Sequence, residues 1–282
     1  MAIITANIQD LTRDDYEIVR RMVYEHSGIN LGEQKMQLVR SRLGKLVRQN
    51  GYPSYRAYID KVVNDKSGQE LCTLLDAIST NTTHLFREKH HFDFLARVLR
   101  EWTSDARWCS ANREVRIWCA ASSSGEEPYS IAMTADDVLR NVSGVGLKIL
   151  ATDISTRMLA KAKAGVFEAE RIETVPGPFR QRYLRKAAGR GEDLVEVVPE
   201  LKRFITFSRF NLMTPTFPFR HGFNVVFCRN VMIYFDRATQ QTLVNKMAHH
   251  LHGGGYLLIG HSESLNNIKH NLAYVEPTVY RK

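Results

Sequence analysis

Short apolar runs alternate with helical segments over the second part of the chain, and this alternation constrains the fold most. The predicted strands are Val115 to Cys119, Leu147 to Thr152, Asn224 to Cys228, Tyr256 to Ile259 and Tyr274 to Tyr280. The predicted helices are Glu88 to Trp102, Pro128 to Leu139, Thr156 to Ala164 and Arg237 to Leu251. Strands that alternate with helices indicate a parallel α/β sheet of the doubly wound, Rossmann-like type.

One segment interrupts this alternation. Val175 to Phe207 contains Pro176, Pro178, Gly189 and Gly191, and it has alternating apolar and polar residues such as those from Leu194 to Val198. Alternation of this kind is typical of strands with one exposed face. We therefore predict an antiparallel β subdomain inserted into the α/β domain at about residues 175–207.

The first part of the chain is predicted to be a small helical domain. Thr12 to Asp15 resembles a capping box, with Leu11 and Tyr16 placed as a hydrophobic staple. Further helical patterns follow, and none of this region resembles a strand. The predicted organisation is a helical domain over residues 1–78, a linker over 79–95 and an α/β domain over 96–282.

Composition excludes several classes of protein. No apolar run approaches the roughly 20 residues of a membrane span, and the N-terminus does not resemble a secretory signal. The four cysteines form no CxxC pair, so reduced thiols are expected. The formal net charge of +9 predicts attraction to nucleic acid, anionic lipid or an acidic protein.

A loop of small and acidic residues, Ala120 to Pro128, lies where doubly wound folds bind nucleotides. It lacks the GxGxxG pattern, and Glu126 and Glu127 disfavour a pyrophosphate at the helix N-terminus. Two carboxylates favour a ligand with a positive group, such as an ammonium or a sulfonium. The alternative is that both acids only stabilise the helix N-terminus.

Polar residues also follow other predicted strands. Asp153 is placed to accept hydrogen bonds from ribose hydroxyls, with capping of the next helix as the alternative. Arg229 and Asn230 are polar in an apolar segment, which favours a ligand there over simple aromatic packing. Asn211, from its local sequence alone, is interpreted as a turn residue.

Two clusters are interpreted as structural. His90-His91 and His249-His250-His252 lack acidic or cysteine partners at metal-ligand spacing, so surface histidines are expected. Gly253-Gly254-Gly255 is interpreted as a helix C-cap and turn.

Four motifs together resemble those of the chemoreceptor glutamate O-methyltransferases, the CheR family. They are Asn81 to Glu88, Ala120 to Ala132, Cys228 to Asp236 and Gly260 to Glu263. They occur in the family's order over nearly the whole chain. One departure is Ser124, where the family often has threonine, and the hydroxyl is kept.

The resemblance implies transfer of a methyl group from S-adenosyl-L-methionine to glutamate side chains of chemoreceptor cytoplasmic helices. The products are glutamate methyl esters and S-adenosyl-L-homocysteine, and no metal is expected. It also implies a helical N-terminal domain and a methyltransferase domain with a small antiparallel subdomain, in agreement with the pattern above. We expect a cytoplasmic bacterial protein that meets membranes only through receptors and binds no nucleic acid.

The same resemblance assigns site residues. Arg87 and Tyr234 are expected nearest the reacting methyl group, as the catalytic residues. Asp153 is expected to hold the ribose of the cofactor. Asn211 and Leu212 are expected to flank its adenine. The full expected cofactor-binding set is Asn81, Thr83, Arg87, Glu127, Asp153, Asn211, Leu212, Arg229 and Asn230.

Partner surfaces are expected at two places. Arg42, Lys45 and Arg48 share one face of a predicted helix, in a stretch from Lys35 to Arg56 without an acid. This face is expected to dock receptor helices, with simple solvation as the alternative. The family resemblance also leaves open binding of a receptor C-terminal tail through Gly189-Arg190-Gly191.

Three other functions stay open from the sequence. They are a small-molecule methyltransferase of the same fold, a dinucleotide-linked oxidoreductase and a non-enzymatic binding module for nucleic acid or receptor. The acidic pair Glu126 and Glu127 argues against the oxidoreductase.

Overall fold

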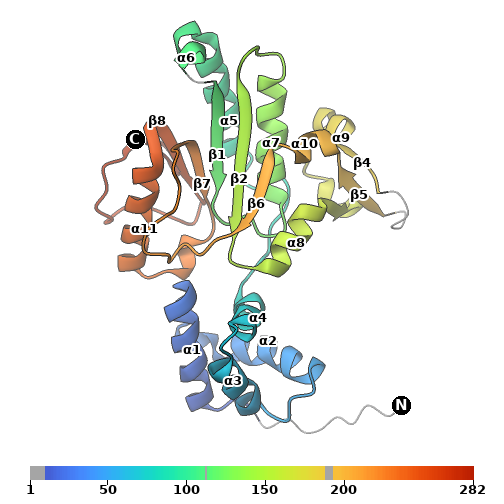
Figure 1. The fold of residues 1–282 in the computed structure, drawn as a ribbon, viewed down its shortest axis with the longest axis vertical. Coiled ribbons are helices and arrows are strands. Elements are labelled where there is room, and N and C mark those ends of the chain that lie inside the picture. Colours follow the sequence, from blue (N-terminus) through green and yellow to red (C-terminus); the bar gives the residue numbers. More distant parts are fainter. Residues whose placement is uncertain (1–9, 112, 188–192) are drawn as a thin grey trace. The chain divides into compact units, whose positions relative to one another are not determined.

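The computed structural model describes residues 10–111, 113–187 and 193–282 (Figure 1). By its internal contacts the chain divides into two compact units. The first comprises Met1–Thr80 with Tyr234–Asp236, and the second comprises Asn81–Ile233 and Arg237–Lys282. Over these described ranges, none of the helices has the length and apolar character needed to cross a bilayer.

The first unit is built of helices. They are α1 (Arg13–Ser27), the 3-10 helix η1 (Glu33–Lys35), α2 (Met36–Gln49), α3 (Tyr55–Asn64) and α4 (Gln69–Ile78). The predicted capping box of α1 is confirmed, because the Thr12 hydroxyl accepts from the backbone N–H of Asp15 and the Asp15 carboxylate accepts from that of Thr12. Apolar faces of the helices form the core, with Val39, Leu43 and Val47 of α2 buried.

The expected basic face of α2 is only partly free. Lys45 and Arg48 are exposed, but Arg42 is half-buried. Its guanidinium donates to the carbonyl of Ile78, at the end of α4, and to the hydroxyl of Thr80 at 2.9 Å. Arg42 therefore satisfies a helix C-terminus, a structural role that the helical pattern of α2 alone does not reveal.

The second unit contains, within the described residues, a seven-stranded sheet of order β6-β2-β1-β7-β8-β10-β9. Its strands are β1 (Glu114–Cys119), β2 (Gly146–Asp153), β6 (Ile205–Arg209), β7 (Phe223–Cys228), β8 (Leu251–Ile259), β9 (Ala273–Glu276) and β10 (Val279–Arg281). The pairs from β6 to β8 are parallel, while β10 pairs antiparallel with β8 and β9. The predicted doubly wound α/β arrangement is thus confirmed, with an antiparallel edge.

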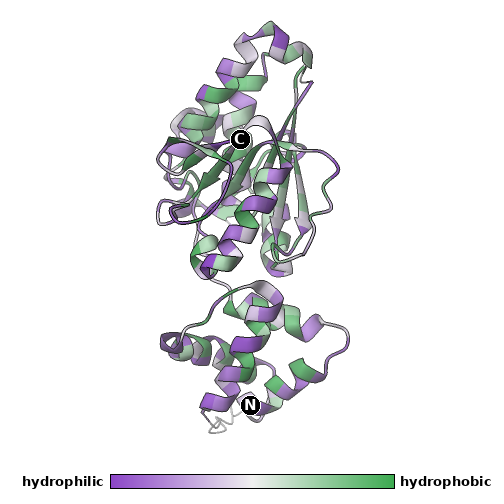
Figure 2. Cartoon of the chain, turned by 90° about the vertical axis from the view of Figure 1, so that its left-hand side faces the viewer, coloured by the Kyte–Doolittle hydropathy of each residue, from purple (hydrophilic) through white to green (hydrophobic). Residues whose placement is uncertain are grey.

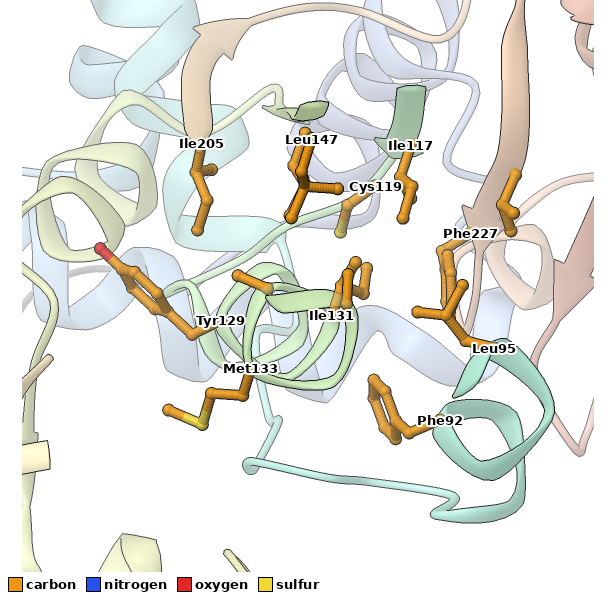
Figure 3. Packing of buried hydrophobic residues seen from close by; sticks show 14 of the residues in the cluster. Phe92, Leu95, Ile117, Cys119, Tyr129, Ile131, Met133, Leu147, Ile205 and Phe227 are labelled. Carbon is orange, nitrogen blue, oxygen red and sulfur yellow. The ribbon is translucent and has the colours of Figure 1, made fainter. Parts of the chain in front are cut away.

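Helices cover this sheet. They are α5 (His90–Ser104), α7 (Glu126–Leu139), α8 (Thr156–Ala164) and α11 (Arg237–His250), and the short helix α6 (Ala106–Ala111) contacts α5. Figure 3 shows Ile117, Cys119 and Phe227 of the sheet facing apolar side chains of α5 and α7. Trp118 points to the opposite face, where its ring meets those of Phe217 and Phe219. In Figure 2 the central strands are largely hydrophobic, as burial on both faces requires.

An inserted antiparallel subdomain is present, but its predicted limits are wrong at both ends. Within the described residues it is a three-stranded sheet of β3 (Val166–Glu168), β5 (Leu194–Val197) and β4 (Leu184–Lys186). It also contains η2 (Ala169–Ile172), α9 (Gly177–Tyr183) and α10 (Pro199–Lys202). The insert therefore begins before residue 175. Ile205 to Phe207, predicted as its last residues, belong to β6, which pairs parallel with β2 in the main sheet.

Two further expectations are corrected at the C-terminal end. Gly253–Gly255 lie within β8 instead of forming a turn, because Gly254 and Gly255 exchange backbone hydrogen bonds with Lys282. The last predicted strand, Tyr274 to Tyr280, is a hairpin of β9 and β10. The first error arises because Gly254 and Gly255 bond to Lys282, which is distant in sequence, and local propensity does not report such pairing. The second arises from a local turn at Pro277 and Thr278 that the prediction overlooked.

Candidate active site

The carboxyl ends of β1, β2, β6 and β7 lie together at one edge of the sheet. Asp153 ends β2 opposite Arg209 of β6, and Cys119 ends β1 beside Phe227 of β7. The loops that leave these strands carry the Ala120–Gly125 segment, Asn211 and Arg229. In open α/β sheets ligands bind at this edge.

A serine-rich turn connects β1 to α7. Gly125 is the N-cap of α7 with φ of 103°, and a Cβ there would lie 2.9 Å from Cα of Ala162. Only glycine combines this backbone conformation with such close packing against α8. The turn thereby fixes where the acids of the first turn of α7 point.

Asp153 links this turn to the next loop. One of its carboxylate oxygens accepts from the backbone N–H of Ser123 at 2.7 Å, and the other accepts from that of Ser155 at 2.9 Å. Ser155 is itself the N-cap of α8, since its hydroxyl accepts from the N–H of Met158. Capping of α8 by Asp153 is therefore excluded. The two hydrogen bonds fix the Asp153 carboxylate between the β1–α7 turn and the loop after β2.

Arg229 lies between two carboxylates. Its guanidinium pairs with Glu127 of α7 and, at 3.0 Å, with Glu88, and it also donates to the carbonyl of Arg87. Only 4% of Arg229 is exposed. A charge this deeply buried requires such partners, so these contacts tie α7, the 80–89 loop and the loop after β7 together.

Local charges perturb the neighbouring groups. Burial alone would raise the pKa of Glu88, but the charge of Arg229 and hydrogen bonds from Asn230 and the His261 backbone hold it at about 2. Burial raises the pKa of the Cys119 thiol, which donates to Glu127 at 3.2 Å. Glu88 therefore stays ionised, and Cys119 stays protonated, at neutral pH.

Glu126 and Glu127 have different partners, which the sequence left open. Glu126 is completely buried and meets the hydroxyl of Ser124 at 2.7 Å and the guanidinium of Arg171 at 3.2 Å. Glu127 is half-buried and faces Arg229. Neither acid simply stabilises the helix N-terminus.

A second buried carboxylate shapes the loop after β7. Glu263 accepts from the backbone N–H groups of Gly260, Asn230 and Met232 at 2.6, 3.0 and 2.7 Å. Asn230 has φ of 56°, a left-handed conformation uncommon for a side-chain-bearing residue. Burial raises the pKa of Glu263, against the effect of these hydrogen bonds.

The other expected site residues are placed as follows. Asn81, Thr83 and Arg87 lie in the 80–89 loop, where the carbonyl of Asn81 accepts from Ser123 at 3.3 Å. Asn211 makes a turn, as its side-chain oxygen accepts from the N–H of Met213 at 2.9 Å, and Leu212 is buried beside it. These residues share the second unit with Glu127, Asp153, Arg229 and Asn230.

Tyr234 is the exception among the expected site residues. It ends the 3-10 helix η3 (Met232–Tyr234) and groups by its contacts with the first unit. The tail-binding candidates Gly189, Arg190 and Gly191 lie outside the described residues.

Sequence reasoning assigned no role to Glu88, Glu263 or Arg171. Glu88 and Glu263 stand within two of the quoted motifs, so a signal for them was present.

The expectation of surface histidines is wrong for His91, which is fully buried and whose ring meets the hydroxyl of Thr278 at 2.7 Å. Burial lowers the pKa of His91 to about 2, so it is neutral.

The residues at this edge fit S-adenosyl-L-methionine. Ser122 Oγ and Arg229 Nε are buried and have no hydrogen-bond partner among the described residues, which leaves polar atoms for a ligand. The carboxylate of Asp153 lies at the same edge, where an acid would be expected to meet a ribose. Over the same described ranges, no cluster of histidine, cysteine and acidic residues has the geometry to hold a metal ion.

Comparison with known proteins gives consistent results. The model described as "CheR methyltransferase, SAM binding domain" matches residues 81–281, and "CheR methyltransferase, all-alpha domain" matches residues 14–79. A chemotaxis protein methyltransferase of Borreliella burgdorferi is 40% identical, covering 97% of this chain and 95% of the relative. Chemotaxis protein methyltransferase 2 of Pseudomonas aeruginosa is 38% identical (95% and 93%), and the Escherichia coli protein is 34% identical (93% and 88%).

Proposed function

Because the chain belongs to the CheR family of S-adenosylmethionine-dependent chemotaxis methyltransferases, we propose that it methylates glutamate side chains of chemoreceptor cytoplasmic helices. The observation that carries the proposal is the match of both family domains over nearly the whole chain, with Asp153 and the Arg229 ion pairs at the ligand-binding edge of the sheet. The products would be glutamate methyl esters, made in the cytoplasm.

The chemistry demands little from acid–base groups. S-adenosyl-L-methionine, when bound, supplies an activated methyl group on a good leaving group. A glutamate side chain titrates well below neutral pH in water, so it is already an ionised nucleophile there. The protein must therefore hold both reactants in line and exclude water, which requires positioning residues more than a general base.

The proposed roles follow from this requirement. Asp153 would accept the ribose hydroxyls, and Glu127 would contribute to the methionine or adenosine contacts. Arg87, whose side chain is 36% exposed, would orient the substrate carboxylate through a charge-assisted hydrogen bond. Tyr234 would position the carboxylate oxygen for attack.

Receptor docking is proposed for the exposed basic residues Lys45 and Arg48 of α2. Receptor helices that carry methylatable glutamates present negative charge, so attraction to this face would be screened by salt. Arg42 was expected to share this role, but it is held by Ile78 and Thr80, so its charge would contribute less directly. No role is assigned to nucleic acid.

The proposal is tested with a purified receptor cytoplasmic fragment. The fragment is incubated with the protein and S-adenosyl-L-methionine, digested, and mapped by mass spectrometry. Methylated glutamates are expected, and Asp153→Ala should abolish them at a limiting cofactor concentration. A protein that binds the cofactor but leaves the fragment unmodified would favour a small-molecule methyltransferase. Preferential binding of NAD would favour an oxidoreductase.

A further inference from the structure

The segment from Thr82 to Glu88, called the 82–88 segment below, has an unusual backbone. Phe86 and Glu88 both have φ of 56°, the left-handed region that side-chain-bearing residues rarely adopt. Such conformations cost about 1–3 kcal/mol each and persist only where surrounding contacts enforce them. The segment carries Arg87 and Glu88, so whatever holds its backbone also places these two side chains.

Part of the restraint comes from the site itself. The backbone N–H of Phe86 donates to the hydroxyl of Ser130 in α7 at 2.9 Å. The carbonyl of Arg87 accepts from Arg229. These two contacts come from α7 and from the loop after β7.

The remaining restraint comes from the inserted subdomain. Arg171 of η2 donates to the carbonyl of Thr83 at 3.4 Å, and Thr174 donates to the carbonyl of Leu85 at 2.6 Å. The ring of Phe179 in α9 lies 5.6 Å from that of Phe86. The insert thus contacts the segment at Thr83, Leu85 and Phe86.

Arg171 also contacts the first turn of α7. Its other guanidinium nitrogen forms an ion pair at 3.2 Å with Oε1 of Glu126, an oxygen that is buried and has no hydrogen-bond partner among the described residues. A fully buried carboxylate without a cation is strongly destabilising, so this pair has a firm reason to persist. One side chain therefore connects the insert to both the 82–88 segment and the first turn of α7.

From these contacts we propose that Arg171 and Thr174 are positioning residues. The inserted subdomain holds the strained 82–88 segment in the conformation that presents Arg87 and Glu88 to the cofactor site. Displacement of the insert is then transmitted to cofactor affinity. This inference rests on the proposed function, because it concerns the same S-adenosyl-L-methionine site.

The test compares cofactor binding by Arg171→Met, Thr174→Val and a matched control. Arg182→Met is the control, because Arg182 also belongs to the insert and also pairs with an acid of α7, Asp137. The two arginines are also equally exposed, since 41% of the Arg171 side chain and 42% of the Arg182 side chain are accessible to solvent. Dissociation constants for S-adenosyl-L-methionine are measured by calorimetry, dissociation rates by stopped-flow, and unfolding midpoints without cofactor.

If Arg171→Met reduces the population of the binding conformation to about a tenth, the dissociation constant rises about tenfold. Thr174→Val should give a smaller rise, Arg171→Lys should recover part of the loss, and Arg182→Met should stay within about twofold of wild type, consistent with an exposed pair. Thr174→Val keeps side-chain shape and serves as the test if Arg171→Met does not fold.

The inference is overturned if Arg171→Met and Thr174→Val lower the unfolding midpoint but bind the cofactor as tightly as Arg182→Met does. That result would give both residues a purely structural role. A wild-type protein that does not bind S-adenosyl-L-methionine would instead refute the proposed function, so the two failures are distinguishable.

Discussion

Replacement of Arg229 by methionine removes the cation between Glu88 and Glu127. The methionine side chain fills part of the same volume, so the main change is electrostatic. Both carboxylates then lose their strongest partner in a site where only 10% of the Glu88 side chain and 13% of that of Glu127 are exposed. We expect Arg229→Met to lower the free energy of unfolding strongly at neutral pH.

The magnitude follows from the pKa of Glu88. A folded-state value of about 2 against an ordinary 4.5 corresponds to about 3 kcal/mol, at about 1.4 kcal/mol per unit. Breaking a buried pair typically costs about 3–5 kcal/mol, which agrees. Because the pKa of this carboxyl is lowered, its stabilisation is present above pH 4.5 and is lost as the pH falls toward 2. The penalty of Arg229→Met should therefore shrink below pH 4.5.

Urea denaturation at several pH values measures this penalty. Arg97→Met is the matched control, since Arg97 forms an exposed pair with Glu276 at 2.6 Å and should cost less than about 1 kcal/mol. Two results would refute the conclusion that Arg229 stabilises the ionised forms of Glu88 and Glu127. One is that Arg229→Met lowers the free energy of unfolding at pH 7 by no more than Arg97→Met does, and the other is that it lowers it by an amount that does not depend on pH.

Four other predictions concern single features. Asp153→Ala should weaken cofactor binding at least about tenfold in calorimetry, through loss of charge-assisted hydrogen bonds; unchanged affinity would remove Asp153 from the site. Tyr234→Phe should lower turnover with little change in cofactor affinity, and a collapse of affinity would instead make it a binding residue. Burial keeps His91 neutral, so acid favours the unfolded state below its ordinary pKa of 6.5. His91→Gln should remove a loss of about 1.4 kcal/mol between neutral pH and pH 5.5, and an identical pH dependence of unfolding would contradict this. Charge reversal at Lys45 and Arg48 should slow receptor methylation and reduce its salt sensitivity without affecting cofactor affinity; unchanged methylation would exclude this docking face.

Much of the fold was predictable because local signals agree with tertiary structure. The capping box at Thr12 and the strand that ends at Asp153 both depend on residues close in sequence. Where pairing partners are distant, prediction failed. Gly254 has the sequence context of a turn residue, yet it lies within β8 and its backbone N–H donates to the carbonyl of Lys282. The insert was predicted to extend to about residue 207, but Ile205 to Phe207 belong to β6, whose partner is β2.

The site was predictable in its residue types and less so in their partners. Motif positions identify Glu127 and Arg229, but only the fold shows that they form an ion pair with Glu88 as the third member. The burial of His91 was unpredictable because Thr278, its partner, lies far along the chain. Arg42 was predicted to be an exposed charge because the residue pattern of α2 gives no information about the carbonyl of Ile78, at the end of α4, to which it donates.

The proposed transfer of methyl groups from S-adenosyl-L-methionine to receptor glutamates can be measured directly. The most direct measurement uses S-adenosyl-L-methionine labelled in its methyl group, with receptor-containing membranes as acceptor. We expect wild-type protein to label the receptor, and mild base to release the label as methanol because carboxyl methyl esters hydrolyse readily. With Asp153→Ala at limiting cofactor we expect no label in the receptor. Label that resists base, or that appears only in small molecules, would contradict the proposed function.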